Sequence, residues 1–205
     1  MWAGSRIEFQ RPLVIGRDIV RESRIDDVTA KHGQSGSLVF VRVRHDIGDA
    51  NGIALTEMQD IVYRDDPKPG VAAPAAPPTP APIPAPIPAH WTRTIVPDPV
   101  LLFRYSALTL NGHRIHYDRP YATGVEGYPG LVVHGPLLAT LLLDLLRRQL
   151  ADPTVSTFTF RALKPTFDGM PFQVCGRHDR GTRNFKLWAQ HADGALAMDA
   201  QATLA

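Results

Sequence analysis

The stretch HGPLLATLLLDLLRRQL, His134 to Leu150, decides how the surrounding chain folds. Its run of leucines predicts a helix. Pro136 lies near the first turn, where a helix tolerates proline, and Arg147 and Arg148 lie near the last turn, where cations are favourable. Apolar residues cover most of the circumference of this helix, which predicts that it is buried rather than lying on a surface.

The chain after this helix predicts an antiparallel sheet. Residues Asn184 to Leu204, NFKLWAQHADGALAMDAQATL, read as a strand, a turn and a second strand. A long buried helix wrapped by an antiparallel sheet is the hot-dog arrangement. The sequence therefore predicts an α+β fold of this kind.

The N-terminal part of the chain repeats the same hairpin. SLVFVRVRHDI, Ser37 to Ile47, alternates apolar and polar residues, GDANG supplies a turn, and IALTEMQDIVY continues as a second strand. Two short alignments relate the parts: RPLVIG over KPTFDG pairs Gly16 with Gly169, and NGIALTEMQDIV over DGALAMDAQATL pairs Gly52 with Gly194 and Gln59 with Gln201. The repeat predicts two hairpins of the same kind.

The first half lacks a counterpart of the leucine-rich helix, so its sheet would expose apolar side chains on the inner face. We therefore expect that Met1 is an internal methionine, and that a longer parent protein carries a strand and a helix upstream. The predicted organisation is an incomplete hot-dog half over 1–66, a linker over 67–90 and a complete hot dog over 91–205. Ten prolines between Pro67 and Pro88 remove too many backbone donors for a helix or a sheet. A spacer is favoured there over an SH3-type ligand, since flanking basic residues are lacking.

Composition narrows the functional classes. The chain has 205 residues, 44% of them hydrophobic, and a net charge of +2 without a run of either sign, so nucleic acid is not an implied partner. The only cysteine, Cys175, cannot form an intramolecular disulfide, which fits a reducing compartment. No signal peptide or membrane span is recognisable. We expect a soluble cytoplasmic protein.

The stretch NGHRIHYDRPYA, Asn111 to Ala122, concentrates polar side chains before the helix. Adding water to a double bond conjugated with a thioester needs a base for the water, a proton for the α-carbon and donors for the enolate oxygen. His116 can exchange the proton near neutral pH, and the Asn111 amide can orient the water. Gly135 lies at the helix start, where free N–H groups favour a negative oxygen and the missing side chain permits close approach.

These residues carry a family resemblance. Phe103 to Leu143, FRYSALTLNGHRIHYDRPYATGVEGYPGLVVHGPLLATLLL, resembles the signature region of the MaoC-like (R)-specific enoyl-thioester hydratases. It is closer still to the subgroup that includes mesaconyl-C4-CoA (3-methylfumaryl-CoA) hydratase, itaconyl-CoA hydratase and mitochondrial 3-hydroxyacyl-ACP dehydratase. MWAGSRIEFQRPL and QDIVYRD extend the resemblance to the first half. It implies a double hot dog in which the second half is catalytic and the first, non-catalytic half shapes the acyl tunnel.

The wider hydratase pattern has an aspartate five residues before the catalytic histidine. This chain departs from the pattern, because Asn111 stands at that position. Asn111 cannot act as a base, so the simplest mechanism without the aspartate uses His116 as the single base. His113 as a partner, or Asp118 or Glu126 as a substitute carboxylate, are alternatives. The subgroup also reads N-x-H-R-I-H, which implies a working variant.

The remaining candidates are weaker. Arg114 is expected either to clamp a phosphate or carboxylate or to be a simple surface residue. Tyr117, Gly130 and His134 are further candidates for substrate contact, although His134 is favoured as a helix cap or packing residue. His45, His90, His178 and His191 are interpreted as solvated.

No cofactor is implied, and metal is not expected, because His113 and His116 lack a third ligand and a recognisable zinc motif. The expected partner is an acyl-CoA or acyl-carrier-protein thioester, with no nucleic acid and no membrane, and a homodimer is expected by analogy. Two other functions compete with hydration. One is a hot-dog thioesterase that would use a carboxylate such as Asp144, and the other is a non-catalytic acyl-binding fragment.

Overall fold

The computed structural model of the chain describes residues 2–33, 36–64 and 88–205. Its elements, in chain order, are β1 (Trp2–Phe9), β2 (Val20–Gly33), β3 (Gly36–Asp49), β4 (Gly52–Arg64), β5 (Trp91–Ile95), α1 (Pro99–Leu108), the 3-10 helix η1 (Arg114–His116), α2 (Arg119–Gly124), α3 (Gly135–Gln149), β6 (Val155–Ala162), β7 (Phe172–His178), β8 (Asn184–His191) and β9 (Leu196–Leu204). Of the linker expected over 67–90, residues 67–87 lie outside the described part of the chain.

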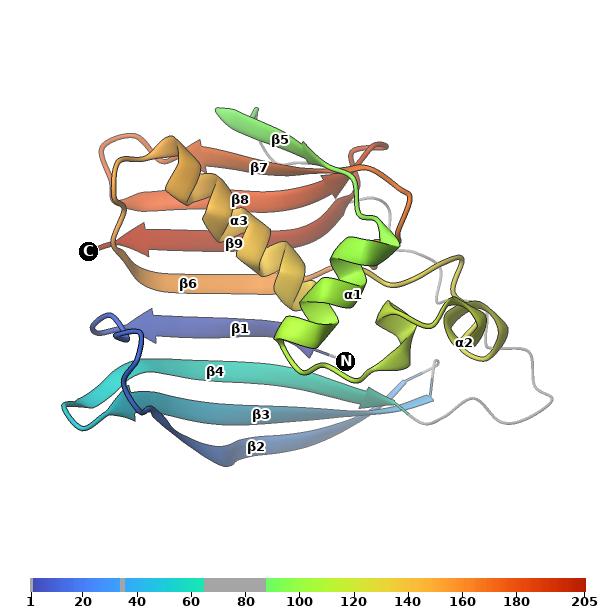
Figure 1. The fold of residues 1–205 in the computed structure, drawn as a ribbon, viewed down its shortest axis with the longest axis horizontal. Coiled ribbons are helices and arrows are strands. Elements are labelled where there is room, and N and C mark those ends of the chain that lie inside the picture. The colour runs from blue at the N-terminus through green and yellow to red at the C-terminus, as the bar shows by residue number, and fades with distance from the viewer. Residues whose placement is uncertain (1, 34–35, 65–87) are drawn as a thin grey trace.

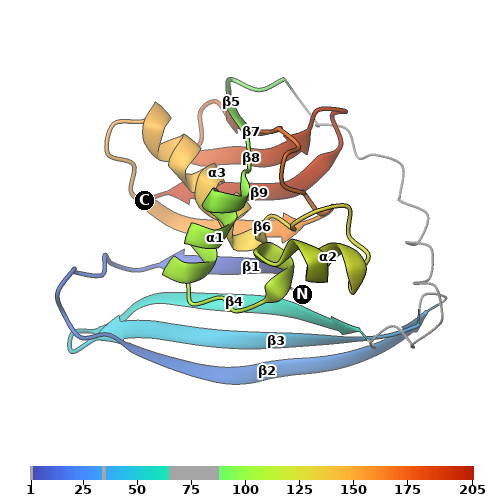
Figure 2. The ribbon, with the colours of Figure 1, turned by 45° about the vertical axis from the view of Figure 1, so that its right-hand side comes forward.

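All nine strands form one antiparallel sheet with the order β2-β3-β4-β1-β6-β9-β8-β7-β5. The two halves of the chain meet where β1 pairs with β6, with Ser5 opposite Phe160 and Ile7 opposite Phe158. Figure 1 shows α3 lying across β6, β9, β8 and β7, whereas β2 and β3 carry no helix in either view (Figures 1 and 2). The predicted α+β hot-dog arrangement is confirmed in the second half.

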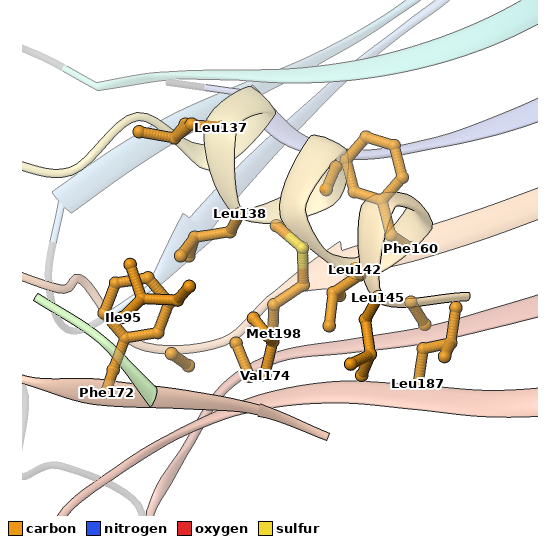
Figure 3. Packing of buried hydrophobic residues seen from close by; sticks show 14 of the residues in the cluster. Ile95, Leu137, Leu138, Leu142, Leu145, Phe160, Phe172, Val174, Leu187 and Met198 are labelled. Carbon is orange, nitrogen blue, oxygen red and sulfur yellow. The ribbon is translucent and has the colours of Figure 1, made fainter. Parts of the chain in front are cut away.

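The core of the second half is built on α3. Its buried side chains are Leu137, Leu138, Ala139, Leu142, Leu145 and Leu146. They pack against strand residues such as Phe172, Val174 and Leu187, as Figure 3 shows. The expected burial holds for most of the circumference of the helix but not for one side, where Leu141 and Leu143 are only half-buried and Thr140 is exposed. That side is not wrapped by β5 to β9, so the sheet of one half covers only part of the circumference.

The first half has two unlike faces because side chains alternate along a strand. Its outer face carries exposed ion pairs such as Arg42 with Asp60. Its inner face leaves Ile25 and Val28 exposed, at 67% and 59%. This bears out the expectation that an inner face without a helix would expose apolar side chains.

His45 on β3 corrects an expectation. The sequence predicts a solvated side chain, but His45 points to the inner face and is buried, with Nδ1 2.7 Å from Ser23 Oγ and Nε2 3.0 Å from Gln59 Oε1. His191 is likewise only partly exposed, and its Nε2 lies 3.0 Å from Thr166 Oγ1. Both histidines find polar partners on neighbouring segments of the fold.

The internal repeat is visible in the backbone. Gly16 and Gly169, paired by the alignment, have φ of 87° and 72°, and Gly52 and Gly194 have φ of 102° and 80°. Residues other than glycine rarely adopt these positive φ values. Equivalent turns therefore recur at the aligned positions. No helix in the described residues is both long and apolar enough to cross a membrane.

Candidate active site

The candidate site lies where the chain between α1 and α3 turns back over the start of α3. Helix α1 begins at a proline and is capped by Asp98, whose side chain accepts the Leu101 N–H at 2.7 Å. After α1 ends, the Asn111 N–H donates to the Ser106 carbonyl at 2.8 Å. Asn111 Oδ1 in turn accepts the His113 N–H at 3.0 Å. Asn111 thus shapes the turn that leads into η1.

His116, at the end of η1, has a fixed ring orientation. Its side chain is buried, and Nδ1 lies 2.7 Å from the Val132 carbonyl oxygen. Because a carbonyl only accepts, Nδ1 must carry the hydrogen, which leaves the lone pair of the neutral ring on Nε2. Burial lowers the pKa of His116, and the neighbouring His113 lowers it slightly further, against the bond to Val132, which raises it. His116 is therefore held in its basic form at neutral pH.

The carbonyl that holds His116 is itself fixed from both sides. The Val132 N–H donates to the Ile115 carbonyl at 3.0 Å, and the Val133 N–H donates to the Thr166 carbonyl at 2.8 Å. Val132 also forms an isolated antiparallel bridge with Phe167. Segment 131–133 therefore ties η1 to the loop before β7.

Asp168 anchors this segment. Its side chain is 3% exposed, Oδ1 accepts the Leu131 N–H at 2.7 Å, and Oδ2 pairs with Arg119 of α2. Gly130 was a candidate for substrate contact, and here it lies against this carboxylate: a Cβ at Gly130 would lie 2.6 Å from Asp168 Oδ1. The position therefore has a packing reason to be glycine.

His134 packs directly on His116. The two rings are stacked, with centroids 3.7 Å apart and planes inclined by 16°. His134 precedes α3 in the capping position, but its side chain makes no cap hydrogen bond. Instead, Nε2 lies 2.8 Å from Ser106 Oγ of α1. Burial, followed by the charges of His116 and His113, lowers the pKa of His134 to about 3.

Gly135 begins α3. The first N–H groups of a helix have no partner within the helix and lie at the positive end of its dipole. A Cβ at Gly135 would meet nothing within 4 Å, so the space beside this residue is open. The start of α3 thus offers a donor to a negative oxygen beside the two stacked rings.

The other predicted residues lie around this centre. His113 is exposed, and its ring approaches His116 edge-on with a centroid distance of 5.6 Å. Arg114 lies over the Tyr121 ring and pairs with Asp118 at 2.7 Å. The Tyr117 hydroxyl donates to the Gly112 carbonyl at 2.8 Å. Arg114 and Tyr117 are therefore engaged within their own loop.

The two carboxylates considered as substitutes for the missing aspartate are also engaged. Asp118 caps α2, and its bonds to Arg114 and to the Tyr121 N–H lower its pKa. Glu126 accepts the Tyr121 hydroxyl at 3.0 Å. Both carboxylates are therefore used in bonds to groups of their own segment.

Asp144, considered for a thioesterase, sits in the middle of α3 rather than at its start. It accepts bonds from Arg148, Arg147 and Arg93, which lower its pKa to about 2. A carboxylate neutralised by three guanidinium groups is a poor base or nucleophile. In the part of the chain that the structure describes, no group of three or more His, Cys, Asp or Glu residues could hold a metal ion.

Sequence reasoning missed Ser106 and Val132. Ser106 is buried on α1, but the same turn also holds Arg104 and Tyr105, so a polar residue there gave no distinct signal in the sequence. Val132 acts through its backbone carbonyl, which carries no signal in the side-chain sequence.

Comparisons with known proteins place the chain in a family. A family model described as hydroxyacyl-thioester dehydratase type 2 matches residues 1–168. The mesaconyl-C(4)-CoA hydratase of Chloroflexus aurantiacus is 51% identical over 204 residues, covering 100% of this chain and 70% of that protein. The mitochondrial hydroxyacyl-thioester dehydratase type 2 of Schizosaccharomyces pombe is 44% identical over 81 residues, covering 38% of this chain and 27% of that protein.

Solved structures agree on the fold. The crystal structure of HtdX from Mycobacterium tuberculosis matches with a TM-score of 0.75 at 17% identity, covering 99% of this chain and 76% of that one. A MaoC-like dehydratase from Phytophthora capsici also gives 0.75, at 16% identity, covering 100% of this chain and 71% of that one. The family match extends from the first strand to the loop that holds segment 131–133. The chain belongs to the hydroxyacyl-thioester dehydratase type 2 family.

Proposed function

We propose that this chain reversibly hydrates an enoyl thioester, with His116 as the base and an acyl group of the mesaconyl-C4-CoA type. The observation that carries the proposal is the bond from His116 Nδ1 to the Val132 carbonyl, because it leaves the lone pair of the neutral ring on Nε2. The substrate type is taken from the Chloroflexus aurantiacus relative.

The proposed reaction needs one base. His116 Nε2 removes a proton from water while the water oxygen forms a bond to the β-carbon of the enoyl group. The double-bond electrons move onto the thioester, and the Gly135 N–H stabilises the resulting enolate oxygen. The imidazolium then returns the proton to the α-carbon, so that one water is added in total.

Asn111 is assigned to water binding rather than to proton transfer. Its Oδ1 is occupied by the His113 N–H. Its NH₂ group remains as a donor, and a donor can orient a water but cannot take its proton. His113 is exposed and meets His116 edge-on, so we assign it a place at the rim of the site.

Hydrolysis of the thioester is the less favoured function. It would need a carboxylate at the site, and Asp144 is bound by three arginines. An acyl-binding role without catalysis remains as an outcome of the test.

The test follows two signals with crotonyl-CoA and mesaconyl-CoA: absorbance of the enoyl-thioester band and release of free thiol. Loss of the band without thiol supports hydration, thiol release supports hydrolysis, and neither signal supports a binding role. His116→Ala is expected to slow hydration by about 10²- to 10⁴-fold. His90→Ala is the matched control, because His90 is exposed at the start of β5. Full activity of His116→Ala would overturn the assignment of the base.

A further inference from the structure

The ring of His134 covers one face of His116. The stacked geometry, with centroids 3.7 Å apart, leaves no room for water between the two rings. His116 is thereby fixed at two places, by the carbonyl of Val132 at Nδ1 and by the ring of His134 on its face. Nε2 has no such partner in the described residues.

His134 is in turn held by α1. Its Nε2 faces Ser106 Oγ at 2.8 Å, and the Tyr105 ring meets it edge-on with a centroid distance of 4.9 Å. His134 is 1% exposed, and its Nδ1 has no hydrogen-bond partner among the residues that the structure describes. Leaving a buried polar atom unpaired costs stability, so stability alone does not explain a histidine at this position.

The surroundings keep His134 neutral. The titratable groups facing it are His116 of η1, His113 just before η1 and Tyr105 of α1, and none of them is an anion at neutral pH. A protonated His134 would carry a hydrogen on both ring nitrogens, with no acceptor for the one on Nδ1 in the described residues, and would place a positive charge against the ring of His116. A neutral His134 places no charge beside His116, so it does not oppose the gain and loss of a proton by His116.

We propose that His134 and Ser106 are positioning residues, which hold the His116 ring so that Nε2 faces the reacting water. Neither touches the substrate. Ser106 fixes the orientation of His134, and His134 shields one face of His116 and blocks rotation of its ring. The proposal rests on His116 being the base of the proposed hydratase.

Three variants test the proposal. His134→Ala opens a space beside His116, so its ring can turn and water can reach it, and we expect kcat to fall by about a hundredfold with a smaller change in KM. His134→Phe keeps a flat neutral ring and is expected to retain kcat within about tenfold of the wild type. Ser106→Ala leaves the ring in place without its hydrogen bond, and an intermediate loss is expected.

The pH profile separates positioning from a merely structural role. Burial lowers the pKa of His116, so the acid limb of kcat/KM should lie below the ordinary histidine value of about 6.5 in the wild type. Water beside His116 in His134→Ala should move that limb to higher pH, and His134→Phe should leave it in place. An unshifted limb in a folded His134→Ala variant, or equal kcat for the Ala and Phe variants, would overturn the proposal.

A measurement without substrate separates this proposal from the proposed function. Two-dimensional NMR of the histidine ring nitrogens in the full chain reports the tautomer and pKa of His116 directly. We expect one hydrogen fixed on Nδ1 in the wild type and in His134→Phe, and a mixture of tautomers with a raised pKa in His134→Ala. A single fixed tautomer in all three proteins would refute the positioning role. If the wild type shows no hydratase activity while the tautomer changes as expected, only the proposed function fails.

Discussion

The carbonyl of Val132 decides at the residue scale which nitrogen of His116 can take a proton. The position of a histidine in the sequence does not tell which of its two ring nitrogens carries the hydrogen. The motif N-G-H-R-I-H could therefore indicate a base without giving its tautomer. The sequence also favoured His116 over His113, and the structure gives the two residues different surroundings, one buried and one exposed. Asn111 stands where the family pattern has an aspartate. Among the described residues, no carboxylate takes the place of that aspartate in shifting the pKa of His116.

Gly130 allows a prediction at this scale. A Cβ there would lie 2.6 Å from Asp168 Oδ1, which is held by the Leu131 N–H and cannot move away freely. We expect Gly130→Ala to lower the free energy of unfolding by about 1–3 kcal/mol, as overpacking typically does. Chemical denaturation followed by circular dichroism measures it. Gly124→Ala is the control, because its Cβ would meet nothing within 4 Å. Equal stability of the two variants would contradict the clash.

At the scale of elements, the site depends on segments that are neither helix nor strand. Hydrophobic patterning predicted α3, β3, β4, β8 and β9, because each buries one periodic set of side chains. It could not predict that segment 131–133 would bridge η1 and the loop before β7, since those bonds join backbone groups. The family resemblance singled out the motif residues, whereas the bonds that orient them came from the structure.

Asp168 provides the prediction for this scale. Asp168→Ala removes the acceptor of the buried Leu131 N–H, which should cost about 1–3 kcal/mol of stability and loosen the carbonyl that holds His116. We expect a fall in kcat of about tenfold or more, measured under conditions where the variant is folded. Asp168→Asn keeps an acceptor oxygen and should recover much of the loss.

Asp60→Ala is the matched control for Asp168. It breaks the ion pair with Arg42, whose two side chains are about half exposed on the outer face of the first half. Exposed pairs of this kind contribute about 0–1 kcal/mol. A loss of activity in Asp60→Ala as large as in Asp168→Ala would show that the effect does not pass through segment 131–133.

At the scale of the whole molecule, aligned glycines in the sequence indicated the internal repeat. Nothing in the sequence indicated the seam, by which we mean the pairing of β1 with β6 that joins the two halves. The repeat predicts two hairpins of the same kind, but strand pairing between distant segments leaves no periodic signal. The structure joins the halves through β1 and β6, and the side chains of Trp2, Ile7 and Phe9 pack against the core of the second half. The enzyme class and family predicted from the motif are confirmed by the comparisons.

This seam predicts that both halves unfold together. Gly4 on β1 lies so close to β6 that a Cβ would be 2.5 Å from the Phe160 carbonyl oxygen. Because backbone cannot yield as a flexible side chain can, Gly4→Ala should force β1 away from β6 and weaken the pairing. We expect the midpoint of thermal unfolding to fall by several degrees, about 4–8 °C for each 1 kcal/mol in a small domain and less in a longer chain.

Tryptophan fluorescence and far-ultraviolet circular dichroism should give coincident transitions in the wild type. Gly112→Ala, where a Cβ meets nothing within 4 Å, should leave both transitions unchanged. Separate transitions in the wild type would mean that the first half is an independent unit, and a Gly4→Ala protein as stable as Gly112→Ala would mean that the seam contributes little.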